Sequence, residues 1–190
     1  MNIFLKALLI LSIIIFSNVL AAKDQEKPID LSAIGGDFTL HSARGDVSLE
    51  DYRGKVVLLY FGYINCPDAC PTTLSQWRKA FNKLNDSEKN RAQGIMVSVD
   101  PERDTLQELD AFTGFFHENI VGVTGSIKEL KSVTKQYGAD FQAKPHKPGK
   151  NYGVDHSFFV FVINAKGKVV DRVDFTLKAD KLVEIIRQAM

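Results

Sequence analysis

The chain has little cysteine: only Cys66 and Cys70 among its 190 residues. Outside the cytoplasm, two cysteines usually form one structural disulfide. A bridge across this pair would close a very small loop, and the stabilisation from a disulfide rises with loop length. The pair therefore indicates chemistry at the two sulfurs, with an inert pair or a small disulfide as the alternative interpretation.

An excess of charge of one sign is also lacking. Lys and Arg number 24 against 23 Asp and Glu, and because Lys6 is the only charge before Lys23, the remainder beyond residue 22 is balanced. A neutral domain has no electrostatic footprint for nucleic acid, which excludes that class of partner. The length and the hydrophobic content of 45% are typical of one globular domain.

Charged residues are scarcest at the N-terminus, where Lys6 precedes the apolar run 7–16 and the small and polar residues 17–22. That order is typical of a secretory signal, with Val19-Leu20-Ala21 as a candidate cleavage site. An uncleaved anchor is the alternative, although the run is short of the roughly 20 apolar residues that span a membrane. The absence of Cys at 17–23 argues against a lipoprotein anchor.

The chain therefore divides into three predicted parts. We expect residues 1–22 to be a signal peptide or membrane anchor, 23–29 a polar tether, and 30–190 the folded domain. Such a chain is exported, and the domain is expected in the periplasm or anchored in the inner membrane facing the periplasm.

Strand and helix patterns alternate along the domain. An N-terminal hairpin is predicted around Gly45, and a glycine-bounded apolar run at 56–61 predicts a strand buried on both faces. Further strands are predicted at 95–99, 120–123, 158–163 and 168–171, and helices after Pro71, Thr105, Ser126 and Lys178, with 139–154 as a long loop. This order predicts an α/β sandwich with a mixed central sheet flanked by helices.

The two cysteines occupy a favourable position in this scheme. They follow the buried strand 56–61, at the end where loops build sites in α/β sheets. Cys70 precedes Pro71 and is expected at the N-cap region of the helix, where the helix dipole favours a thiolate. The Cys-x-x-x-Cys spacing leaves room for an ion between the sulfurs, and soft sulfur ligands suit Cu(I).

A third donor is expected among the four histidines. His41 and His117 are interpreted as surface or packing residues, and His146 lies in a basic, proline-containing loop. His156 directly precedes the strand 158–163, which is expected beside the cysteine strand. Asp155 next to it would orient the loop or the ring. A purely structural His156 stays open on these grounds.

Longer motifs surround these residues. They are Phe-Gly-Tyr-x-x-Cys-Pro-Asp-x-Cys-Pro at 61–71, Ser-Val-Asp-Pro-Glu-Arg-Asp-Thr at 98–105, Val-Thr-Gly at 123–125 and Tyr-Gly-Val-Asp-His-Ser at 152–157. In this order, over roughly residues 30–190, the chain resembles the Sco/SenC family of copper-binding assembly proteins for cytochrome c oxidase.

The resemblance implies a thioredoxin-like fold and one copper ion on Cys66, Cys70 and His156, with Asp68 and Asp155 behind these ligands. It implies Cu(I), and the ligand set also tolerates Cu(II). It further implies a role at the binuclear CuA centre of oxidase subunit II, either supplying copper or reducing the cysteines of that centre.

Alternatives stay open. A metallochaperone is favoured, and a thiol–disulfide oxidoreductase, which would be an enzyme, is the second hypothesis. An exported copper or redox sensor would share the site, and zinc fits the ligand types but lacks an evident fourth ligand. Peroxidase activity is disfavoured because no peroxiredoxin-type Pro-x-x-x-Thr-x-x-Cys pattern ends at either cysteine. Lys144–Lys150 is interpreted as a docking loop for an acidic partner or as a solvated loop.

Overall fold

The structure is a computed structural model that describes residues 30–143 and 152–190. Its elements, in chain order, are η1 (Leu31–Ala33), β1 (Thr39–Ser42), β2 (Gly45–Ser48), η2 (Leu49–Tyr52), β3 (Val56–Gly62), α2 (Ala69–Lys83), α3 (Asp86–Lys89), β4 (Ala92–Ser98), α4 (Leu106–Phe116), β5 (Ile120–Val123), α5 (Ile127–Gln136), β6 (Phe141–Ala143), β7 (Val154–His156), β8 (Phe159–Ile163), β9 (Val169–Asp174) and α6 (Ala179–Ala189).

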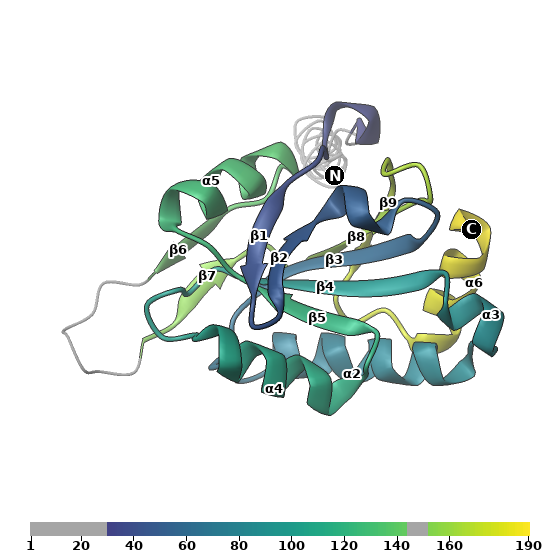
Figure 1. The fold of residues 1–190 in the computed structure, drawn as a ribbon, viewed down its shortest axis with the longest axis horizontal. Helices are drawn as coiled ribbons and strands as arrows, with labels where there is room; N and C mark the ends of the chain where they lie inside the picture. Colours follow the sequence, from purple (N-terminus) through teal and green to yellow (C-terminus); the bar gives the residue numbers. More distant parts are fainter. Residues whose placement is uncertain (1–29, 144–151) are drawn as a thin grey trace, which may run out of the picture.

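The central sheet has five strands in the order β5-β4-β3-β8-β9. Strands β3, β4 and β5 are parallel, whereas β8 is antiparallel to β3 and β9 to β8. Helices α2 and α4 run along one side of this sheet, and α5 and the β1–β2 hairpin lie on the other (Figure 1). The predicted mixed sheet flanked by helices, with an extra N-terminal hairpin, is therefore confirmed.

Strand β3 lies at the centre of the core. All seven of its residues are buried, as a strand covered on both faces requires. On one face Phe61 meets Tyr137 and Phe161 edge to face, with ring centroids 6.0 and 6.1 Å away. Aromatic pairs in this geometry add stabilisation beyond the apolar area they bury. The strand that carries the cysteine loop is thus held rigidly.

Both predicted capping boxes are confirmed. The Thr105 hydroxyl accepts from the Glu108 N–H at the start of α4, and Ser126 does the same for Glu129 at the start of α5. The side chain of Ile127 at the start of α5 is 42% exposed. As the first residue of the helix, Ile127 lies beyond the part of α5 that packs on the core.

The interpretation of 139–154 as a single loop was wrong at both ends. Strand β6 pairs antiparallel with β7, and Phe141 is opposite His156. Each strand is only three residues long, which is too short for a pattern of alternating hydrophobicity to reveal. The consequence is functional, because His156 is held in a strand rather than in a loop.

Several predictions concern residues outside the described ranges. These are the signal or anchor at 1–22, the tether at 23–29, and Lys144–Lys150 with its His146. Within the described ranges, none of the helices combines the length and the apolar character that crossing a membrane requires.

Candidate metal centre

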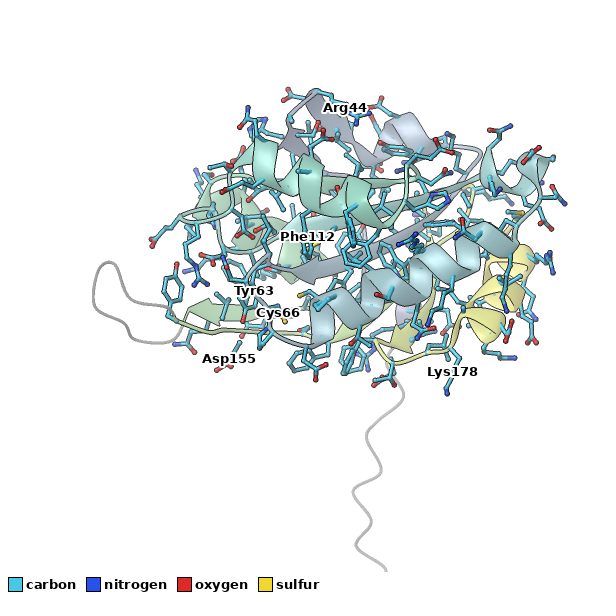
Figure 2. All side chains as sticks on the ribbon, turned by 90° about the horizontal axis from the view of Figure 1, so that it is seen from below. Arg44, Tyr63, Cys66, Phe112, Asp155 and Lys178 are labelled. Atoms are coloured by element: carbon cyan, nitrogen blue, oxygen red, sulfur yellow. The ribbon has the colours of Figure 1, made fainter. Side chains whose placement is uncertain are left out.

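The ligand atoms of Cys66, Cys70 and His156 lie within 4.8 Å of one another. The Nε2 atom of His156 is 3.9 Å from the Cys70 sulfur, although 86 residues separate the two in the chain. Figure 2 shows Cys66 beside Tyr63 and Asp155 at one end of the molecule. The structure therefore brings together the three residues that were predicted as ligands.

The carboxyl end of β3 positions the cysteines. The chain leaves β3 at Gly62 and turns so that the Cys66 N–H donates to the Tyr63 carbonyl. Helix α2 begins at Ala69, two residues before the predicted start at Pro71, and Cys70 is its second residue. Pro71 is tolerated there because the N–H groups of the first turn have no partner within the helix.

Cys70 is fully buried and its sulfur is fixed from two directions. The backbone N–H of Tyr63 donates to it at 3.5 Å, and the Tyr60 hydroxyl lies 3.8 Å away. Cys66 is only half buried, and both thiols are free. The Cys70 sulfur is therefore a fixed interior group, and the Cys66 sulfur is the one that other molecules can reach.

Gly62 is a site residue that the sequence reasoning did not single out. A Cβ atom at this position would lie 2.7 Å from the Cys70 sulfur and 2.8 Å from the Tyr60 ring. Real Cβ atoms essentially never come so close to another atom, so the missing side chain makes the space that the sulfur fills. The glycine within the Phe-Gly-Tyr motif was the available signal.

The orientation of His156 follows from its ring nitrogens. Nδ1 lies 3.1 Å from the Ser157 carbonyl oxygen, which only accepts hydrogen bonds, so Nδ1 carries the proton. Nε2 then presents its lone pair toward the sulfurs, the form in which imidazole binds a metal. The ring is buried and meets Tyr60 and Tyr63 edge to face, at 5.9 and 5.6 Å between centroids.

Asp68 and Asp155 were predicted to support the ligands from behind. The hydrogen-bond partner of His156 Nδ1 is the Ser157 carbonyl, and Asp155 is an exposed neighbour on β7. Asp68 is the N-cap residue of α2, and its backbone N–H helps to lower the pKa of Cys66. Both residues line the cavity beside the site.

The two thiols differ strongly in acidity. Hydrogen bonding from the Cys70 thiol lowers the pKa of Cys66 well below its usual range, against the effect of burial. The backbone N–H groups of Cys70 and Asp68 lower it further. The same hydrogen bond, together with burial, raises the pKa of Cys70. In the reduced pair the hydrogen bond therefore favours a thiolate on Cys66 over one on Cys70.

A cavity of about 580 Å³ opens onto the site. Its wall contains Cys66 and His156, and beside them Arg103, Phe158 and Phe175. Phe158 is 47% exposed and its ring centroid lies 5.6 Å from that of Phe175. The space is far larger than one ion needs, so groups from another molecule have room to approach Cys66.

The other described histidines have structural surroundings. His41 is exposed on the hairpin, with Nδ1 2.7 Å from Asp46. His117 packs against Phe81 with ring centroids 5.2 Å apart, and its Nδ1 accepts from the Asn119 N–H. Both match the predicted surface and packing roles.

The donor set fits a soft metal ion. Thiolate and imidazole ligands bind at about 2.0–2.3 Å, so three donors around one ion lie about 4 Å apart. The present donors need only a small contraction from their 4.8 Å limit. Two sulfurs and one nitrogen suit Cu(I), and this set also tolerates Cu(II).

Comparison with known proteins adds independent findings. The chain matches the SCO1/SenC family over residues 26–190. It is 35% identical over 158 residues to the mitochondrial protein SCO2 of Saccharomyces cerevisiae, an alignment that covers 82% of this chain and 52% of that protein. It is 32% identical over 180 residues to an SCO2-like protein of Rickettsia conorii, covering 89% of this chain and 87% of the relative. The chain thus spans about half the length of its yeast relative.

Solved structures give the same picture. The apo Sco1 protein of Thermus thermophilus is similar with a TM-score of 0.77 and 33% identity, covering 83% of this chain and 92% of that one. Bradyrhizobium japonicum ScoI with copper bound is similar with a TM-score of 0.75 and 28% identity, and the match covers 83% of this chain and 100% of that one. A third structure is that of BsSco, a member of the Sco family of cytochrome c oxidase assembly proteins in which a disulfide switch was identified. Its TM-score is 0.63 and its identity 25%, and the match covers 87% of this chain and 98% of that one. These likenesses and the mixed sheet confirm the expected thioredoxin-like α/β fold.

Proposed function

The chain belongs to the SCO1/SenC family, and on that premise we propose that it is a copper metallochaperone for cytochrome c oxidase. It binds one copper ion through Cys66, Cys70 and His156 and supports assembly of the CuA centre. The single observation that carries the proposal is the convergence of two sulfurs and the Nε2 lone pair within 4.8 Å.

The uneven burial of the three donors suits transfer of the ion. Cys70 and His156 are 0% and 7% exposed and are held by hydrogen bonds to backbone groups, whereas Cys66 faces the cavity. Thiolates of an acceptor protein would enter through this cavity and replace the ligands one at a time. Cys66 would be exchanged first because it is the most accessible donor.

The likenesses support the choice of copper and the place of action. A structural relative was solved with copper bound, and another belongs to a family of oxidase assembly proteins. The acceptor we propose is subunit II of the oxidase or another copper protein. The site would then act outside the cytoplasm, in the periplasm or on the outer face of the inner membrane, with residues 1–22 as the signal or anchor.

A second candidate function is supported by the acidity of the thiols. An exposed thiolate beside a buried, protonated thiol is also the arrangement of a thiol–disulfide oxidoreductase. In that role the Cys66 thiolate would attack a disulfide in the acceptor's copper site, form a mixed disulfide and release one acceptor thiolate, which takes the Cys70 proton. The Cys70 sulfur would then attack Cys66, so that the Cys66–Cys70 disulfide forms and the reduced acceptor is released. Electrons pass from the two cysteines to the acceptor disulfide.

Anaerobic titration of the reduced full chain with Cu(I), against a chelator of known affinity, tests the first function. We expect one tight equivalent, lost on oxidation of the cysteine pair and strongly weakened in His156→Ala. His41→Ala is the matched control, since His41 is exposed on the hairpin. Equal affinity of His156→Ala and the parent would refute the three-ligand site.

Transfer to an acceptor separates the two functions. The acceptor is a peptide that carries two cysteines. In its reduced form it can receive copper from the copper-loaded chain, and in its oxidised form it can receive electrons from the metal-free, reduced chain. Delivery predicts rapid copper transfer that slows in Cys66→Ser. Rapid reduction of the oxidised peptide by His156→Ala, without copper transfer by the parent, would favour the oxidoreductase.

A further inference from the structure

The turn that follows β4 contacts two parts of the metal site without supplying a ligand. The cysteine half is the loop between β3 and the start of α2, and the histidine half is Tyr152 together with β7, which carries His156. The turn spans 100–104 and belongs to the second of the longer motifs in the sequence. We infer that Asp100, Arg103 and Asp104 are positioning residues that set the distance between the cysteine loop and the histidine strand. The inference rests on the proposed function only in so far as the ion held there is copper.

The histidine half is tied to the turn through Tyr152. The Tyr152 hydroxyl donates to Oδ1 of Asp100 at 2.7 Å, and the Arg103 Nε donates to Oδ2 of the same carboxylate at 2.5 Å. The Arg103 guanidinium also lies over the Tyr152 ring, 3.6 Å from its centroid. Each of the three residues contacts the other two, and Tyr152 is four positions before His156.

The Asp100 carboxylate is only 3% exposed, and so buried a charge requires hydrogen bonds to every free oxygen. Arg103 and Tyr152 supply them. Removing either partner would leave one carboxylate oxygen unsatisfied, which costs more than a surface hydrogen bond. The segment leading into β7 is therefore fixed by a contact that its own short strand could not provide.

The cysteine half is tied to the same turn through Asp104. Oδ2 of Asp104 accepts from the backbone N–H of Ile64 at 2.9 Å and from the Ser98 hydroxyl at 2.6 Å. Ile64 lies in the loop between β3 and the cysteines, two residues before Cys66. Asp104 is 2% exposed, so this contact is screened little by solvent.

The two ties meet at Tyr63. Its ring meets that of His156 edge to face at 5.6 Å between centroids, its backbone N–H donates to the Cys70 sulfur, and the Arg103 guanidinium lies 5.7 Å from its ring centroid. Arg103 thus lies close to a tyrosine from each half of the site. This arrangement orders the donors before the ion binds, which reduces the entropic cost of binding.

Tyr152→Phe is the most selective test, because it removes the hydroxyl and keeps the ring beneath Arg103. Because the hydrogen bond to Asp100 is lost in this variant, strand β7 with His156 must become ordered as the ion binds. We expect the Cu(I) affinity of the full chain to fall by about tenfold, the lower end of what one lost hydrogen bond to a charged group costs. Tyr137→Phe is the matched control, since it removes a hydroxyl that donates to the Gly36 carbonyl at 2.9 Å on another part of the domain.

A double-mutant cycle assigns the effect to the histidine. In the His156→Ala background Tyr152→Phe is expected to cause no further loss of affinity. A loss of equal size in both backgrounds, or no loss in the parent background, would overturn the inference. In the Cu(II) form, the nitrogen hyperfine coupling in the electron paramagnetic resonance spectrum should weaken in Tyr152→Phe and stay unchanged in Tyr137→Phe.

A readout without metal keeps the inference separate from the proposed function. Hydrogen exchange of the Val154 amide should become faster in Tyr152→Phe and in Arg103→Lys, with unchanged exchange in the β3 core. Unchanged exchange at Val154 in both variants would overturn the inference, whether or not copper binds. Failure of the parent chain to bind copper, with faster exchange at Val154 in the variants, would refute the proposed function alone.

Discussion

The sulfur of Cys70 occupies the space that a side chain on Gly62 would need: a Cβ there would lie 2.7 Å from it. The last residue of β3 and the second residue of α2 therefore restrict each other. The sulfur is held against the backbone at the end of the strand, which also donates to it from the Tyr63 N–H.

Gly62→Ala should disturb the site by overpacking it. The added methyl forces the Cys70 sulfur or the Tyr60 ring to shift, and overpacking of a buried position costs about 1–3 kcal/mol of unfolding free energy. Urea unfolding measures this loss, and the affinity for Cu(I) should fall with it. Gly114→Ala is the control: it lies within α4 with nothing near the added Cβ and should stabilise by up to about 1 kcal/mol.

Cys66 should be the reactive thiol of the reduced chain. Its pKa is lowered by the hydrogen bond from Cys70, so the thiolate persists as the pH falls, until the pH approaches that lowered pKa. An ordinary thiol, with a pKa of about 8.5, would lose its reactivity roughly tenfold per pH unit below neutrality. Alkylation by iodoacetamide, followed by mass spectrometry, should modify Cys66 at a rate nearly constant from about pH 8 to pH 5.

The Cys70→Ala variant gives the control for that experiment. It removes the thiol donor and should raise the pKa of Cys66, so alkylation becomes strongly pH-dependent. A flat profile in the parent and in Cys70→Ala alike would contradict the hydrogen bond as the cause.

Metal binding should release about one proton at neutral pH, because Cys66 is already ionised and only the Cys70 proton must leave. The bound form holds fewer protons than the free form, so affinity rises with pH, about tenfold per unit. Titration calorimetry in buffers of different ionisation enthalpy counts the protons directly. Release of about two protons would mean that both thiols are protonated in the free chain.

Thr105→Ala should destabilise the domain without changing the site. Its hydroxyl accepts from the Glu108 N–H, and Glu108 returns a bond to the Thr105 N–H. Loss of such a cap costs about 1 kcal/mol of unfolding free energy. Thermal unfolding should register the loss while Cu(I) affinity stays at the parent value. Weaker Cu(I) binding in Thr105→Ala would mean that the cap also orders the neighbouring Asp104.

Much of the fold was predictable because its signals are local. The run 56–61, the capping residues Thr105 and Ser126 and the glycine-marked hairpin each specify an element by themselves. The pairing of Phe141 with His156 was not predictable, since two three-residue strands carry no periodicity of their own. The start of α2 at Ala69 rather than Pro71 was missed because no side chain caps that helix.

The candidate site divides in the same way. The chain itself determined that Cys66 and Cys70 lie together at the end of a buried strand, because their spacing and Pro71 are sequence features. Motif resemblance and position pointed to His156. Only the tertiary structure decided which atoms face each other: β8 runs antiparallel to β3, which brings His156 Nε2 to 3.9 Å from Cys70. The role of Gly62 and the Ser157 carbonyl also emerged only there, because a close approach and a hydrogen bond depend on distances that sequence spacing does not contain.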